Sequence, residues 1–199
     1  MNWRRLIFVL LPMLLVMEHA LAKRVPVGEE NTHEARKVAT SGNDMRRARR
    51  MGIIAAGAGA LGIGGIELEL NFSPHSGIVL GFGGGSDFQA FAFEYKQVLA
   101  GEWLLPYMGM GFAKWQNFGK NGPISETTPG VLADRFLTPD NKRSGRVNES
   151  LLYPKFGLQY MQLEGDWAGF SVFAELVVLI DLNNFIAGPT GGVGVGYYF

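Results

Sequence analysis

The chain has 199 residues and no net formal charge at pH 7. Hydrophobic residues make up 47% of it, charged residues only 18%, and there is no cysteine. The lack of cysteine excludes disulfides, thiolate metal sites and a lipid-modified N-terminal cysteine. After the first 22 residues, no apolar run reaches the roughly 18 residues of a transmembrane helix, so any membrane face must be spread over alternating strands.

Residues 1–22 are predicted to be a secretory signal peptide. Arg4 and Arg5 form the positive start, residues 6–17 the apolar run, and Ala20-Leu21-Ala22 the small-residue cleavage site. The apolar run is about a dozen residues long, whereas a spanning helix needs roughly 20, so a retained anchor is the weaker alternative. The mature chain is therefore expected to begin at Lys23.

Residues 23–50 are predicted to form a flexible, basic periplasmic extension. They contain eight basic and four acidic residues and no sustained apolar period. Such a segment cannot bury enough apolar surface to offset the entropy of ordering. Its arginine-rich end, residues 46–50, is expected to be a solvated tail. Binding to nucleic acid is an alternative, but an exported chain rarely meets nucleic acid, and anionic phospholipid head groups are the more common partner of such a stretch.

Residues 51–199 alternate between apolar and polar or small residues and are broken by turns, which predicts an all-β fold. Eight strands are expected, near residues 52–61, 66–72, 77–83, 88–99, 103–116, 150–163, 169–182 and 190–199. An even number of strands of about ten residues is typical of a small antiparallel transmembrane β-barrel. A short helix over Met51–Ile66 is the competing interpretation, although its six glycines would weaken it by up to about 1 kcal/mol each.

The lengths of the connections agree with a barrel that has both ends in the periplasm. The short turns at residues 73–76, 100–102 and 164–168 would then lie on the periplasmic side, and the long loop 117–149 would be external. Short periplasmic turns and longer external loops are usual in such barrels.

The last strand ends the chain on an aromatic residue. Large apolar side chains alternate here with glycines and therefore lie on one face of the strand: Val193, Val195, Tyr197 and Phe199. This ending resembles the terminal strand of bacterial outer-membrane β-barrels, in which such a pattern is the assembly signal. The resemblance implies that the barrel assembly machinery recognises this strand.

Residues 51–199, about three quarters of the chain, resemble small OmpA/OmpX-like outer-membrane β-barrels of Gram-negative bacteria. The likeness is carried by the runs at 65–72 and 105–112 and by the terminal Gly-Tyr-Tyr-Phe. It implies a monomer in the cell outer membrane, in contact with outer-membrane lipid. The family includes adhesins, membrane-stabilising proteins, narrow pores and a few enzymes, so the fold does not decide the function.

Eight charged residues are predicted to face the interior of the barrel: Glu67, Glu69, Glu94, Lys96, Lys114, Lys155, Glu175 and Asp181. An eight-stranded barrel is only wide enough to be filled by side chains, so a network of ion pairs in a mostly plugged interior is expected. The alternative is a narrow path that favours cations, because acids outnumber bases in this set.

Seven aromatic residues are expected to form girdles at head-group depth: Trp103, Tyr107, Trp115, Phe156, Tyr160, Tyr197 and Phe199. In the long external loop, the basic cluster of Lys142, Arg143 and Arg146 could pair with phosphates of outer-leaflet lipid or stay solvated.

No catalytic site, metal site or cofactor is expected. His19 leaves with the signal peptide, His33 lies in the extension, and His75 lies in a turn beside Ser76. No cluster of His, Asp and Glu has the spacing of a metal site. The sequence thus predicts a structural or surface-contact barrel that is not an enzyme. A narrow channel is the first alternative, and a lipid-modifying enzyme is the second.

Overall fold

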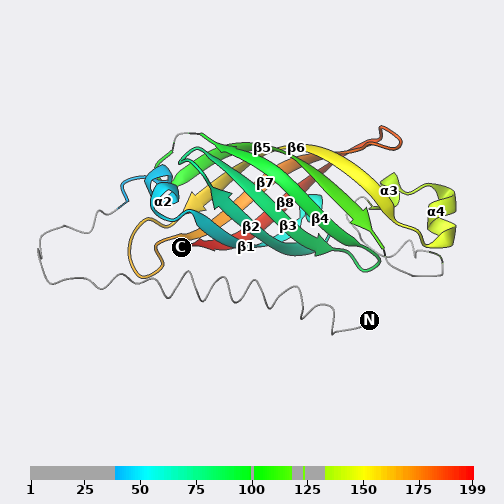
Figure 1. Ribbon diagram of the computed structural model, residues 1–199, viewed down its shortest axis with the longest axis horizontal. Helices are drawn as coiled ribbons and strands as arrows, with labels where there is room; N and C mark the ends of the chain where they lie inside the picture. The colour runs from blue at the N-terminus through cyan, green and yellow to red at the C-terminus, as the bar shows by residue number, and fades with distance from the viewer. Residues whose placement is uncertain (1–38, 100, 118–122, 124–132) are drawn as a thin grey trace, which may run out of the picture. The chain divides into compact units, whose positions relative to one another are not determined.

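The computed structural model in Figure 1 describes residues 39–99, 101–117, 123 and 133–199. The predicted signal peptide, residues 23–38 of the predicted extension, and residues 118–122 and 124–132 of the predicted loop lie outside the described residues. None of the described helices is long and apolar enough to cross a membrane.

Eight antiparallel strands close into a barrel in which each strand pairs with its sequence neighbours and β1 pairs with β8. Their bounds are β1 Met51–Ala58, β2 Gly64–Asn71, β3 Ser76–Gly84, β4 Gln89–Val98, β5 Leu104–Gln116, β6 Asn148–Met161, β7 Phe170–Asp181 and β8 Ala187–Tyr198. The predicted fold class is confirmed.

The first hairpin excludes the helical interpretation of Met51–Ile66. Met51 pairs with Leu70, and the register runs without interruption to Gly57 opposite Gly64. A short 3-10 turn, η1 Gly59–Leu61, joins β1 to β2 and places Leu61 inside the barrel with 1% of its surface exposed. Gly62 follows with φ +86°, which glycine adopts without strain.

Residues 42–50 do not behave as the predicted flexible extension. Helix α2 Gly42–Ala48 precedes β1, and the side chain of Ser41 caps it by accepting a hydrogen bond from the backbone N–H of Asp44. Met45 and Arg46 of α2 are buried. One end of the barrel carries α2, the start of β1 and the end of β8, and we call it the α2 end.

The opposite end carries the connection between β5 and β6, and we call it the loop end. The predicted loop 117–149 contains two short helices, α3 Ala133–Phe136 and α4 Pro139–Ser144. Thr138 caps the start of α4, and Gly145 ends it in the left-handed conformation with φ 68°. In Figure 1, α2 and the pair α3 and α4 lie at opposite ends of the barrel.

Large inward-facing side chains lie over glycines on the neighbouring strand. Gly157 of β6 is paired with Tyr107 of β5, and a Cβ atom at Gly157 would overlap the tyrosine ring. Tyr153 lies over Gly111 in the same way. Glycines thus make room in a narrow interior for aromatic rings from the adjacent strand.

Candidate functional site

The first ionic cluster of the barrel interior is built around Glu69 of β2. One carboxylate oxygen accepts a hydrogen bond from the guanidinium of Arg46 in α2. The other accepts from Lys96 Nζ at 2.9 Å and from the Tyr198 hydroxyl at 2.7 Å. Gln159 completes the cluster by accepting from Lys96 Nζ at 3.1 Å and donating to the Tyr198 hydroxyl at 2.8 Å.

The second ionic cluster lies around Lys155 of β6. Its Nζ atom is 2.8 Å from a carboxylate oxygen of Glu94 and 2.8 Å from one of Glu175. The Tyr107 hydroxyl donates to Glu175 at 2.7 Å, and the Nζ atom of Lys96 lies 4.3 Å from the centre of the Tyr107 ring. Tyr107 therefore connects the two clusters.

The two clusters compensate each other in charge. Arg46, Lys96 and Lys155 supply three cations, while Glu69, Glu94 and Glu175 supply three anions. The paired side chains are at most 7% exposed. Buried charges are strongly unfavourable unless they are paired and hydrogen-bonded, so each of these groups depends on its partners.

The structure places five of the eight predicted interior charges in these clusters: Glu69, Glu94, Lys96, Lys155 and Glu175. Glu67 also faces inward on β2 and lies near Lys155, Glu94 and Glu175. Asp181 is fully buried at the loop end, where it accepts hydrogen bonds from the backbone N–H groups of Asn183 and Asn184. Asp181 thus shapes the turn between β7 and β8.

The prediction that Lys114 faces the interior is wrong. Its strand, β5, turns Leu105, Tyr107 and Trp115 inward, each at most 1% exposed, so Lys114 lies on the outer face. There its Nζ atom donates to the Ser150 hydroxyl at 2.9 Å. Both faces of β5 are apolar, so the alternation did not reveal which face is inside.

Because the inward face of β5 was predicted wrongly, two aromatic residues of the predicted girdles also lie inside the barrel. Tyr107 packs in the interior, and Trp115 stacks on Phe88 with ring centres 4.7 Å apart while its indole N–H donates to the carbonyl oxygen of Ala60. The remaining five lie on the outer surface: Trp103, Phe156, Tyr160, Tyr197 and Phe199.

Arg46 is the residue that the sequence analysis missed. It was assigned to the flexible extension, yet it is fully buried and also donates through Nε to the carbonyl oxygen of Pro74 at 3.0 Å. The excess of acidic residues in the predicted interior could have indicated Arg46, because buried carboxylates require a compensating cation from elsewhere in the chain.

Apolar layers lie on both sides of the charged clusters. At the α2 end, the buried residues Met45, Ile54, Val98, Leu105, Met161 and Phe173 pack together. At the loop end, the layer contains Leu61, Phe88, Trp115, Phe136, Leu137, Leu151, Val177 and Leu179. The described interior therefore combines two ionic clusters with two groups of packed apolar side chains.

The four residues of the predicted assembly signal lie on the outer face of β8. Val193, Val195, Tyr197 and Phe199 are all exposed, while the intervening glycines face inward. Among the described residues, Arg49 is the cation over the Tyr197 ring, at 5.5 Å from its centre. Recognition of this strand by the assembly machinery stays a prediction.

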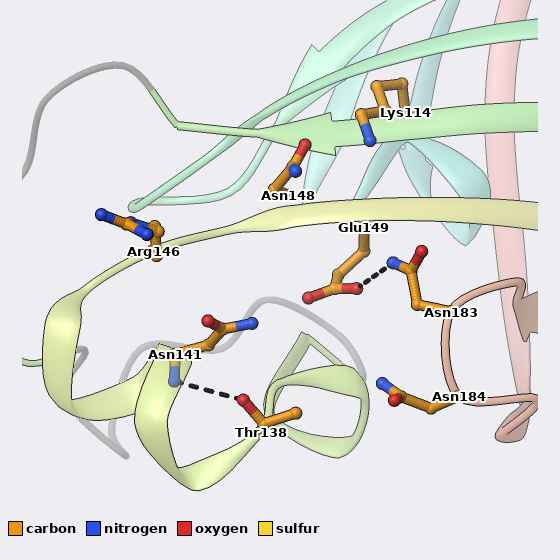
Figure 2. Close-up of a pocket in the computed structure, with 8 residues that line it drawn as sticks. All are labelled: Lys114, Thr138, Asn141, Arg146, Asn148, Glu149, Asn183 and Asn184. Carbon is orange, nitrogen blue, oxygen red and sulfur yellow. Dashed lines mark hydrogen bonds between the residues drawn. The ribbon is translucent and has the colours of Figure 1, made fainter.

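A polar pocket of about 390 Å³ lies at the loop end. Figure 2 shows the side chains that line it, which come from the end of β5, from α4 and the residues on either side of it, from the start of β6 and from the turn before β8. Arg146 of the predicted basic cluster is among them. Lys142 and Arg143 belong to α4 but do not line the pocket.

No group of three or more His, Cys, Asp or Glu within the described ranges could hold a metal ion. His75 lies in the turn before β3 with Nδ1 3.2 Å from the carbonyl oxygen of Val98, and the Ser76 hydroxyl donates to Gln97 instead of to His75. This group is part of a turn.

Comparison with known proteins supports the fold. No family model matches the sequence, and no curated protein matches it. Among solved structures, the chain is similar to the N-terminal β-barrel domain of Pseudomonas aeruginosa OprF, with a TM-score of 0.52 and 18% identity. The match covers 75% of this chain and 96% of that domain. The predicted resemblance to small outer-membrane barrels is thus confirmed at the level of the fold.

Proposed function

We propose that the protein is a monomeric outer-membrane β-barrel with a closed interior, which has a structural role in the membrane and makes surface contacts through its loop end. The observation that supports the proposal is the position of two compensating ionic clusters between two apolar layers. A barrel filled in this way stabilises itself and leaves its outer surfaces for function.

The outer face of the strands supports a location in lipid. Large apolar side chains are exposed on most strands, among them Ile66, Phe82, Phe93, Met110, Phe156, Leu176 and Val193. A water-soluble monomer rarely exposes such a large contiguous apolar surface, whereas a membrane barrel requires one. The likeness to the OprF barrel domain supports the same location.

Helix α2 contributes to the closure at its end of the barrel. Arg46 enters the interior and pairs with Glu69, and Met45 packs in the apolar layer. The backbone N–H of Gly42 donates to the carbonyl oxygen of Glu102 at 2.6 Å, which attaches the start of α2 to the turn before β5. In this proposal α2 stays docked and blocks the barrel interior at this end.

A cation path is the second candidate, and the position of Arg46 favours it under one condition. If α2 left the barrel, Glu67, Glu69, Glu94 and Glu175 would face only Lys96 and Lys155 in the interior. A net acidic lining favours cations. Undocking of α2 would therefore expose a cation-favouring interior.

Conductance in planar bilayers tests the proposal. The wild-type protein, shown to be folded by a heat-dependent shift in gel migration, should not conduct. Single channels in the folded wild type would overturn the closed barrel. Cation-selective conductance that appears only in Arg46→Ala, and not in the exposed Arg47→Ala control, would support α2 as the seal. The surface-contact role is tested by deleting residues 119–144, after which the barrel should fold and a surface phenotype should disappear.

A further inference from the structure

The polar pocket at the loop end has the size and position of a ligand site. At about 390 Å³ it falls within the range of small-molecule sites, and the mouth of a barrel is a usual place for one. Every residue that lines it is polar or charged, including Lys114, Asn141, Arg146, Asn148 and Glu149. This lining does not suit an apolar ligand.

The side chains of the pocket are held in place by the protein itself. Glu149 is buried to 98% and accepts a hydrogen bond from the Asn183 amide at 2.9 Å. The Asn184 amide donates to buried Asp181 at 2.9 Å, which fixes the turn that carries both asparagines. Figure 2 shows Asn183 pointing toward Glu149 across the space between the turn and β6. A site prepared in this way loses little entropy when it binds.

The pocket combines amide groups with cations. A side-chain amide offers a carbonyl acceptor and an NH₂ donor, which together match a sugar hydroxyl that both donates and accepts. Asn141 and Asn148 lie on either side of the start of β6 (Figure 2). Arg146 is exposed at the rim, and Lys114 uses one of its three donors on Ser150. The two cations lie at different edges of the pocket in Figure 2, so a single phosphate or carboxylate group suits the guanidinium of Arg146, which can bind it through two hydrogen bonds.

We propose that this pocket binds an acidic saccharide, with its hydroxyl groups on the asparagine amides and its phosphate or carboxylate on Arg146. The same chemistry occurs in a free sugar phosphate and in a lipid-linked one. The inference rests on the proposed surface-contact role of the loop end and adds the class of ligand. It does not depend on whether the interior conducts.

Titration calorimetry of the full folded chain in detergent micelles tests the inference with three probes: glucosamine 6-phosphate, glucosamine and inorganic phosphate. We expect the sugar phosphate to bind at least tenfold more tightly than either of the other two. Arg146→Ala and Asn148→Ala should each weaken it at least fivefold. Arg143→Ala removes the same charge from neighbouring α4, outside the pocket, and should leave binding unchanged.

Three results would overturn the inference. Phosphate that binds as tightly as the sugar phosphate would mean a simple anion site, and an equal effect of Arg143→Ala and Arg146→Ala would mean general charge attraction. The third result is no saturable binding of the sugar phosphate, either free or as lipid A in the micelle. Binding of only the lipid A form, lost in Arg146→Ala, would support the site and identify a lipid-linked ligand.

The heat-dependent gel shift of each variant shows whether it is folded, so a loss of binding can be attributed to the pocket. Failure of the pocket and failure of the surface-contact role are distinguishable. If deletion of residues 119–144 abolishes a surface phenotype while no saccharide binds, the pocket assignment alone is wrong. If that phenotype persists while Arg146-dependent binding is measured, the surface-contact role fails and the pocket stands.

Discussion

Arg46 and Glu69 form a fully buried ion pair that joins the helix before the barrel to the second strand, 23 positions later in the chain. The pair is shared, because Glu69 also accepts from Lys96 and Tyr198. A carboxylate with three charged or hydroxyl donors is well compensated, but the Arg46 guanidinium has only Glu69 as its anionic partner among the described residues.

Loss of Arg46 should therefore destabilise the folded barrel. Breaking a buried pair typically costs about 3–5 kcal/mol, and we expect Arg46→Ala to lie near the lower limit because Glu69 keeps two donors. Urea unfolding of the protein in detergent would measure the change. Arg47→Ala is the matched control, since Arg47 is exposed on the same helix and should change the free energy of unfolding by less than about 0.5 kcal/mol. Equal effects of the two substitutions would contradict the burial of Arg46.

Lys155 should matter more than Arg46, because its removal leaves two carboxylates without their shared cation. Lys155→Met is expected to lower the free energy of unfolding by about 3–5 kcal/mol. Lys114→Met is the control, because Lys114 lies on the outer face with a single hydroxyl partner. The triple substitution Glu94→Gln, Lys155→Met and Glu175→Gln should recover part of the loss, and no recovery would argue against charge as the cause.

The fit between Tyr107 and Gly157 predicts a steric effect. In Gly157→Ala the new methyl group would overlap the tyrosine ring and displace it from Glu175, so the barrel should unfold at lower denaturant concentration, with a loss of about 1–3 kcal/mol. Gly191→Ala adds the same group on β8, where its nearest neighbour is 3.5 Å away, and should be nearly neutral. Tyr107→Ala combined with Gly157→Ala should remove the overlap.

Asp44 gives a pH dependence to the docking of α2. Hydrogen bonds from the hydroxyl groups of Thr40 and Ser41 lower the pKa of Asp44 below its ordinary value of 3.8. Because the pKa is lower in the folded state, the stabilisation is present above about pH 4 and is lost as the pH falls through the folded value. The protection of the α2 amides from exchange, taken relative to the intrinsic exchange rate at each pH, should therefore fall in acid. In Asp44→Asn the exchange should lose this dependence, and an unchanged pH profile would contradict it.

The predicted assembly signal leads to a kinetic expectation. Phe199→Ala should slow the insertion of newly made chain into the outer membrane without a comparable change in the stability of the assembled barrel. Pulse-labelling followed by the heat-dependent gel shift would measure the rate. Val178→Ala removes an exposed apolar side chain from β7 and is the control for lost lipid contact. If both variants assemble at the same reduced rate, Phe199 has no special role.

The inward face of a strand could be predicted from the sequence where the two faces differ in chemistry. It could not be predicted where both faces have similar residues. On β4 and β6 charged residues mark the interior, so Glu94, Lys96 and Lys155 were placed correctly. On β5 the inward face consists of aromatic, aliphatic and glycine residues that resemble the outward face. The prediction therefore took Lys114, the only lysine of β5, as the mark of the inward face, although this residue lies on the outward face.

Helices α2, α3 and α4 were missed for a different reason. They have seven, four and six residues, too few to show an apolar period of 3.6 residues. Their positions depend on contacts distant in sequence, such as that between Arg46 and Glu69, and local patterns do not contain this information. The pocket could not be predicted either, since four separate segments meet there.

Glu69 has a further consequence for the order in which the chain folds. Its donors come from the segment before the first strand, from the fourth strand and from the last strand. A nascent barrel that lacks its final strand would hold this carboxylate without the Tyr198 hydroxyl, and one without α2 would lack the guanidinium. Ring closure and docking of α2 are therefore thermodynamically linked through one side chain, so that each event increases the stabilisation gained from the other.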